Sequence, residues 1–119
     1  MTTSRLEIGK LGEDLAEAYL RTQHYTILGR NLRFEHSEVD ILAHDPVDDV
    51  LAFVEVKTRS RFTEDFLPEK NAGRKKWAAL RRAMRQYVAR HGYEGGYRMD
   101  LISVIDGCIT DHVKEVGWR

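Results

Sequence analysis

The sequence predicts an α/β fold in which a mixed sheet of about five strands is flanked by helices. Two long segments carry apolar residues at helical spacing, and several shorter segments read as strands. The Asp106-Gly107 pair between the last two extended segments is typical of a hairpin turn. A chain of 119 residues has room for one sizeable core, so we expect a single domain over residues 1–119.

The first element expected is a helix from about Arg5 to Thr22. Its apolar residues recur at helical spacing: Ile8, Leu11, Leu15 and Tyr19. Gly9 and Gly12 lie inside this helix, although a glycine there costs about 1 kcal/mol relative to alanine. A close approach of the helix to the sheet would compensate for that cost and would carry Glu13 toward the interior. The alternative leaves Glu13 as an ordinary surface residue.

Strands and a second helix complete the expected order. The elements are strands over residues 25–34, 37–44 and 51–59, a helix over residues 74–90, and two strands within residues 97–113. The first of these strands contains Gly29, where we expect a bend. In the strand near the end of the chain, Arg98 and Asp100 alternate with apolar residues. They either orient a site or pair with each other, and we favour the pairing.

Composition excludes several classes of protein. No apolar run approaches the roughly 20 residues that a membrane helix needs, and no signal peptide opens the chain, so we expect no membrane partner. The only cysteine, Cys108, cannot form an internal disulfide, which is typical of a protein of the reducing cytoplasm. None of the five histidines sits at zinc-ligand spacing, so we expect no structural zinc site.

Charge is balanced over the whole chain but unevenly distributed along it. Residues 70–90 hold eight basic side chains and no acidic one, whereas residues 1–69 hold eight basic and fourteen acidic ones. A basic helix of this kind could follow a phosphate backbone, which makes nucleic acid the expected partner. A solvated helix surface is the alternative. The candidate nucleic-acid-binding residues are Arg74, Lys75, Arg81, Arg82 and Arg85.

Four charged residues are expected to meet where the second and third strands pair. If those strands pair across the turn at residues 46–49, Asp40 lies opposite Glu55, and Glu38 lies opposite Lys57. Side chains directly opposed across two strands have Cβ atoms roughly 4.5–5.5 Å apart. Two carboxylates at that distance repel each other, so either one is protonated or both share a cation.

Two interpretations of this cluster remain open from the residues alone. Glu38 and Lys57 could form a cross-strand ion pair, with Asp40 at a solvent edge. We favour the second interpretation, in which Asp40 and Glu55 hold Mg²⁺ or Mn²⁺, since hard oxygen ligands suit these ions. Lys57 would then orient or help to deprotonate an attacking water, or stabilise developing negative charge. These are the parts of a metal-assisted phosphodiester hydrolase.

At these residues the sequence resembles a known family. Asp40, fourteen intervening residues and then Glu55-Val56-Lys57 resemble the D…E-x-K core of the PD-(D/E)xK nuclease superfamily, whose fold is restriction-endonuclease-like. The surrounding segments appear in the order seen in the YraN-like family, small bacterial proteins similar to archaeal Holliday-junction resolvases. These segments are "GKLGEDLAEAYL", "GRNLRF", "SEVDILAHD", "FVEVKTR" and "YRMDLI".

The resemblance implies roles for particular residues. It implies Glu13, Asp40 and Glu55 as metal ligands and Lys57 as the catalytic lysine beside Asp40 and Glu55. Further matches to the family motifs are Glu38 and Arg59. A family lysine early in the second helix corresponds to Lys75 or Lys76, and Ser37 stands where the family usually has glycine.

The expected function is therefore metal-dependent DNA endonuclease activity on branched or otherwise structured DNA. Since junction-cleaving enzymes commonly act as symmetric dimers, a homodimer is the expected assembly. An inert nucleic-acid-binding module that retains the nuclease fold is the alternative. A third interpretation makes the charged cluster a buried structural network in a protein-interaction domain.

Overall fold

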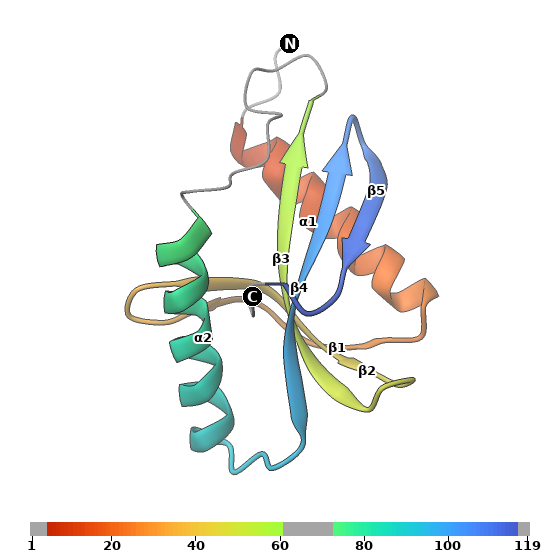
Figure 1. Ribbon diagram of the computed structural model, residues 1–119. Helices are drawn as coiled ribbons and strands as arrows, with labels where there is room; N and C mark the ends of the chain where they lie inside the picture. Colours follow the sequence, from red (N-terminus) through yellow and green to blue (C-terminus); the bar gives the residue numbers. More distant parts are fainter. Residues whose placement is uncertain (1–4, 61–72, 117–119) are drawn as a thin grey trace.

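The computed structural model describes residues 5–60 and 73–116, with the backbone alone at residues 5, 6, 73 and 74. Two helices and five strands follow one another in the predicted order (Figure 1). They are α1 (Arg5–Thr22), β1 (Thr26–Arg33), β2 (Glu38–Asp45), β3 (Val50–Arg59), α2 (Gly73–Arg90), β4 (Gly96–Ile105) and β5 (Cys108–Val113). In the β4–β5 hairpin, Asp106 and Gly107 both have positive φ, as the predicted turn requires.

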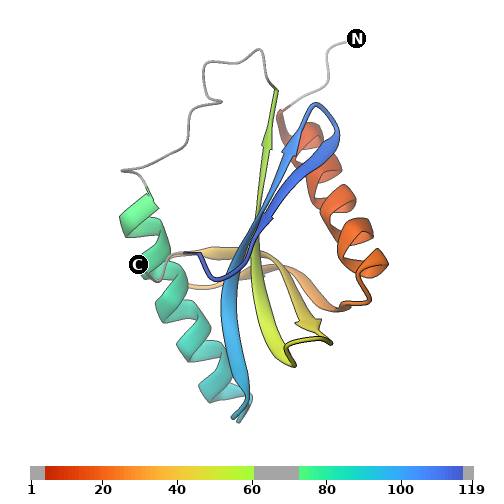
Figure 2. The same ribbon diagram turned by 45° about the vertical axis from the view of Figure 1, so that its right-hand side comes forward.

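The five strands form one sheet in the order β1-β2-β3-β4-β5. β3 and β4 run parallel, joined through α2, and the other neighbours are antiparallel. The two helices lie on opposite sides of this sheet (Figure 2). The predicted class, a mixed sheet of five strands flanked by helices, is therefore confirmed. The bend expected at Gly29 is a shift of register between Ile27 and Gly29.

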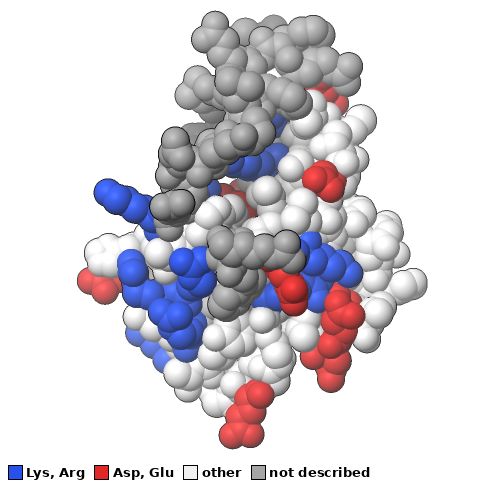
Figure 3. Space-filling model, in the orientation of Figure 1, with Lys and Arg blue, Asp and Glu red and all other residues white. Residues whose placement is uncertain are grey.

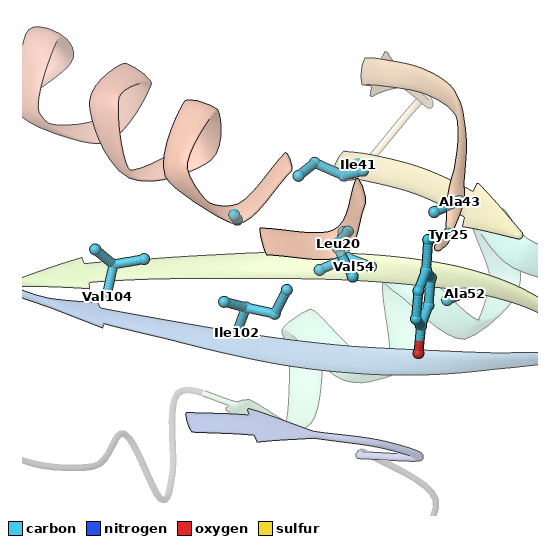
Figure 4. Packing of buried hydrophobic residues seen from close by; sticks show 9 residues of the cluster. Leu20, Tyr25, Ile41, Ala43, Ala52, Val54, Ile102 and Val104 are labelled. Atoms are coloured by element: carbon cyan, nitrogen blue, oxygen red, sulfur yellow. The ribbon is translucent and has the colours of Figure 1, made fainter. Parts of the chain in front are cut away.

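Each helix covers its own apolar cluster because strand side chains alternate between the two faces of the sheet. The cluster under α1 contains Ala16, Leu20, Tyr25, Ile41, Ala43, Ala52, Val54, Ile102 and Val104 (Figure 4). The cluster under α2 contains Val39, Leu42, Leu51, Phe53, Leu80, Met84 and Met99. No helix in the part of the chain that the structure describes is long and apolar enough to cross a membrane.

The sheet divides where β2 leaves β3. The two strands pair in the predicted register from Asp45 opposite Val50 to Ile41 opposite Val54. Among the described residues the ladder ends there, although β2 begins three residues earlier, at Glu38. The β1–β2 hairpin then sweeps toward α2 while β3 continues with β4 (Figure 1). We call the place where β2 and β3 part, marked by Asp40 and Glu55, the fork.

The close approach of α1 to the sheet occurs at one of its two glycines. A Cβ atom added to Gly12 would lie 1.9 Å from Thr58 Oγ1 of β3. A Cβ atom added to Gly9 would meet none of the described residues within 4 Å. The packing explanation is therefore confirmed for Gly12 and wrong for Gly9, which lies on an open part of the helix.

The two glycines should respond oppositely to alanine. Gly12→Ala is expected to lower the free energy of unfolding by about 1–3 kcal/mol, because the methyl group overpacks against a stiff threonine. Gly9→Ala should raise it by up to about 1 kcal/mol, because alanine favours the helix. Urea denaturation of the two variants and the unmutated protein checks this. Equal effects at both positions would contradict the packing.

A buried polar network lies at the end of β2 away from the fork. The Arg98 guanidinium, only 4% exposed, donates to Asp45 Oδ2 at 2.7 Å and to Asp100 Oδ1 at 2.8 Å. It also donates to the Tyr25 hydroxyl, which in turn donates to Asp45. His112 Nε2 lies 2.8 Å from Asp100 Oδ2. The predicted pairing of Arg98 with Asp100 is confirmed, within a larger network.

This network should make folding sensitive to acid. Burial raises the pKa of Asp45 and Asp100, but hydrogen bonds from Arg98 to both, and from His112 to Asp100, lower it more. A carboxyl group whose folded pKa is depressed stabilises the fold above its unfolded pKa of about 3.9, and that stability is lost as the pH falls through the folded value. We expect the free energy of unfolding in urea to fall progressively below about pH 4. A value that stays constant down to about pH 2.5 would contradict this.

Candidate active site at the fork

Asp40 and Glu55 bring two carboxyl groups together where the strands part. Asp40 Oδ2 accepts a hydrogen bond of 2.8 Å from the Val56 backbone N–H. The side chain thus satisfies a backbone donor of β3 that a continued ladder would have satisfied. Glu55 is buried, with 9% of its surface exposed, on the face of β3 that α2 covers. The predicted meeting of Asp40 and Glu55 therefore occurs through their side chains.

The electrostatics of Asp40 are unusual for an aspartate. Burial raises its pKa to about 7, and the charge of Glu55 and a hydrogen bond between the two carboxyl groups raise it as well. The Val56 N–H and the charge of Lys76 act in the opposite direction but do not compensate. Near neutral pH the pair therefore retains a proton easily, and a cation would replace that proton favourably.

α2 closes one side of the site. Lys76 Nζ forms an ion pair with Glu55 Oε1, so this lysine, rather than Lys75, reaches the acidic core. A pocket of about 460 Å³ opens beside the pair. Its described lining residues are His36, Ser37, Glu38, Asp40, Glu55, Lys75, Lys76, Ala79 and Leu80.

Glu13 approaches the fork from α1 and is held by residues of β1. Arg30 Nη2 donates to Glu13 Oε1 at 3.3 Å. With its amide nitrogen turned toward the carboxylates, Asn31 donates to Glu13 at 3.1 Å and to Glu38 at 3.2 Å. Burial and the charge of Asp40 raise the pKa of Glu13, although Arg30 acts to lower it. Glu13 thus belongs electrostatically to the fork and is not an ordinary surface residue.

The other predicted residues lie at differing distances from this core. Lys57 follows Glu55 by two positions on β3, hence on the same face of the strand, and is half-buried. Glu38 lies opposite Arg33 of β1. The described β2–β3 ladder ends at Ile41, so Glu38 is not paired with Lys57 as predicted. Arg59 Nη1 donates to the Thr58 carbonyl oxygen at 2.9 Å. Among the described lining residues of the pocket, neither Lys57 nor Arg59 appears.

The basic residues of α2 gather on the outer side of the helix. Lys75, Arg82 and Arg85 are exposed and Arg81 is half-buried, while the side chain of Arg74 lies outside the described residues. Several Lys and Arg side chains lie on the side of the molecule formed by α2 (Figure 3). Since Lys75 also lines the pocket, this surface begins at the fork and continues along the helix.

The donor chemistry at the fork fits a divalent cation. Within residues 5–60 and 73–116, no three Asp, Glu, His or Cys side chains already meet as a metal-ligand group. Mg²⁺, however, commonly takes only one or two protein carboxylates and keeps several waters. Asp40 and Glu55 supply those carboxylates, and the pocket leaves room for water beside them.

Comparison with known proteins shows which family has this arrangement of segments. A family model described as "Uncharacterised protein family UPF0102" matches residues 12–104. This chain belongs to the UPF0102 family. Among its relatives, the UPF0102 protein of Chlorobium chlorochromatii is 35% identical, over 97% of this chain and 94% of the relative. The UPF0102 protein of Syntrophotalea carbinolica is 39% identical over 87% of this chain and 83% of the relative. The UPF0102 protein of Solibacter usitatus is 44% identical over 82% of this chain and 74% of the relative. The YraN-like resemblance is thereby confirmed.

Three residues of this UPF0102 protein contact the predicted acidic site residues although the sequence did not predict that they would: Arg30 and Asn31 contact Glu13, and Lys76 contacts Glu55. Arg30 and Asn31 lie in the "GRNLRF" segment, for which no role was expected, and Lys76 was not separated from Lys75. Asn31 did carry a local signal, because asparagine tolerates positive φ and is disfavoured within a strand, and its φ is 53°. The contact of Lys76 depends on where α2 docks, which no local pattern reveals.

Proposed function

We propose that this protein is a metal-dependent endonuclease that hydrolyses phosphodiester bonds in DNA. The observation that carries the proposal is the pair of carboxyl groups at the fork, from half-buried Asp40 and buried Glu55. The pKa of Asp40 in this pair is raised to about 7 by burial and by Glu55. Such a pair is costly to keep in a folded protein unless a cation completes it. The basic surface of α2 begins at the same pocket, where an anionic substrate would enter.

Each residue has a definite task in the proposed reaction. Asp40 and Glu55 would hold Mg²⁺ or Mn²⁺, and Glu13 would complete or position the ligand shell of the ion. A bound divalent ion supplies Lewis-acid activation of the phosphate and of the attacking water. Lys57 orients that water and stabilises the negative charge that develops as the new P–O bond forms and the bond to the leaving sugar oxygen breaks. Arg82 and Arg85 neutralise phosphates of the flanking strand.

A second candidate function is favoured by one specific contact. Because Lys76 already neutralises Glu55, the fork is electrostatically satisfied in part without a metal ion. An inert module that binds nucleic acid through α2 is therefore the alternative.

For the nuclease, the family resemblance suggests branched DNA as the substrate and a homodimer as the assembly. The single cysteine, Cys108, is typical of a protein of the reducing cytoplasm.

A cleavage assay separates the two candidates. Purified protein is incubated with a labelled four-way junction or a matched linear duplex, with Mg²⁺ or Mn²⁺ or with a chelator, beside Glu55→Gln protein prepared identically. Metal-dependent cuts made only by the unmutated protein support the nuclease, and a preference for the junction defines the substrate class. Salt-sensitive binding that survives Glu55→Gln, without cuts in either metal, would support the inert module instead.

A further inference from the structure

Lys76 occupies the position of a counter-ion at the fork. Its ammonium group pairs with Oε1 of Glu55, whose side chain is only 11% exposed. Its charge also acts on Asp40, where it lowers the pKa against the larger effects of burial and Glu55. One ammonium group thus faces both carboxylates that would hold a divalent cation.

Lys76 is placed so that its ammonium group can separate from Glu55. The Lys76 side chain is 42% exposed, whereas its partner Glu55 is almost wholly enclosed. Lysine carries a flexible stem of four carbons, so the ammonium group can move away from Glu55 within the pocket without moving α2. Lys76 already lines the pocket, together with Lys75 on the same helix and with His36 and Ser37, which precede β2.

We propose that Lys76 is a displaceable counter-ion: it neutralises Glu55 while the fork is metal-free, and on metal binding it moves away from Glu55 within the pocket and binds the substrate phosphate. A divalent cation at Asp40 and Glu55 would compete with the ammonium group for the same oxygens and would repel it. A phosphate at the metal then offers the released ammonium group a new anion. Metal loading and phosphate binding are coupled through this one side chain, which deepens and rests on the proposed function.

The proposal predicts effects of opposite sign on two measured quantities. Lys76→Met should tighten Mn²⁺ binding, measured by calorimetry without DNA, by about tenfold, because a competing positive charge is removed. At saturating Mn²⁺ the same variant should cleave DNA at least about tenfold more slowly, because the phosphate loses its ligand. Lys76→Arg, which keeps the charge, should leave the Mn²⁺ affinity within about twofold of that of the unmutated protein.

Lys75→Met is the matched control for metal affinity, since Lys75 lines the same pocket and does not pair with Glu55. Its Mn²⁺ affinity should change by less than about twofold. Unchanged or weaker Mn²⁺ binding by Lys76→Met, or no Mn²⁺ binding by any of the proteins, would overturn the counter-ion role. Tighter Mn²⁺ binding by Lys76→Met with no DNA cleavage by the unmutated protein would uphold that role, and the proposed nuclease activity would then be the part that fails.

Discussion

Asp40→Asn is expected to abolish metal-dependent DNA cleavage, with a loss of at least about a thousandfold, because the cation loses a carboxylate and its charge. The fold should survive, since asparagine keeps an oxygen that can accept the hydrogen bond from Val56 N–H. Asp49→Asn is the matched control, because Asp49 lies in the turn at the other end of the β2–β3 pair and its side chain is 89% exposed. Cleavage by Asp40→Asn at the rate of the unmutated protein would contradict the role of Asp40 as a metal ligand of the nuclease.

The same substitution should stabilise the metal-free protein in a pH-dependent way. Burial and Glu55 raise the folded pKa of Asp40 to about 7, above its ordinary value. A carboxyl group with a raised pKa costs stability as the pH rises from its unfolded pKa of about 3.9 through the folded value. At about pH 8 the free energy of unfolding of Asp40→Asn should therefore exceed that of the unmutated protein by roughly 2–4 kcal/mol. Near pH 4 the two free energies should be almost equal.

Urea denaturation of both proteins in the presence of a chelator measures that gain at each pH. Among the described residues, Glu55, Glu13 and Lys76 act on Asp40 through their charges, and all three are present in both proteins. A gain of the same size at both ends of the pH range would mean that the buried charge of Asp40 is not its cause.

Arg98→Met should lower the free energy of unfolding by about 3–5 kcal/mol, a large part of the total for a domain of this size. The cost arises because Asp45 and Asp100, 1% and 0% exposed, would each remain buried without their guanidinium partner. Thermal and urea unfolding near neutral pH measure the loss. Arg90→Met, at an exposed position near the end of α2, should change stability by less than about 0.5 kcal/mol.

A triple variant tests whether the stability lost in Arg98→Met comes from buried carboxylates left without a charged partner. Adding Asp45→Asn and Asp100→Asn to Arg98→Met should recover part of the lost stability, because the unpaired carboxylates are neutralised together with the arginine. A triple variant less stable than Arg98→Met alone would show that the other hydrogen bonds of these two residues dominate instead.

The fold was predictable from the sequence because its signals are local. α1 has the predicted bounds, since its apolar spacing is regular, and the Asp106-Gly107 turn fixed the last hairpin. The register of β2 against β3 followed from the length of the turn between them. The ladder ends one residue short of Asp40 and Glu55, and continuing its register would place them opposite each other, so the meeting of the two carboxyl groups was predictable as well.

The rest of the site depends on tertiary docking. The sequence could not show that β2 leaves β3 at Asp40, because splaying of two strands has no periodic signature. It also could not show that Lys76 rather than Lys75 meets Glu55, since one residue along a helix turns a side chain by about 100° and the rotation of α2 is set by its apolar contacts. The full extent of the Arg98 network was missed for the same reason, because Tyr25, Asp45 and His112 come from separate elements.

The claim on which the proposed function depends is that the fork binds a divalent cation. Calorimetric titration of Mn²⁺ into the unmutated protein, Asp40→Asn and Asp49→Asn tests it without reference to any substrate. One Mn²⁺ bound per chain, weakened at least about tenfold by Asp40→Asn and unchanged by Asp49→Asn, is the expected result. Equal Mn²⁺ affinity in all three proteins, or no Mn²⁺ binding by the unmutated protein, would contradict a metal centre at Asp40 and Glu55.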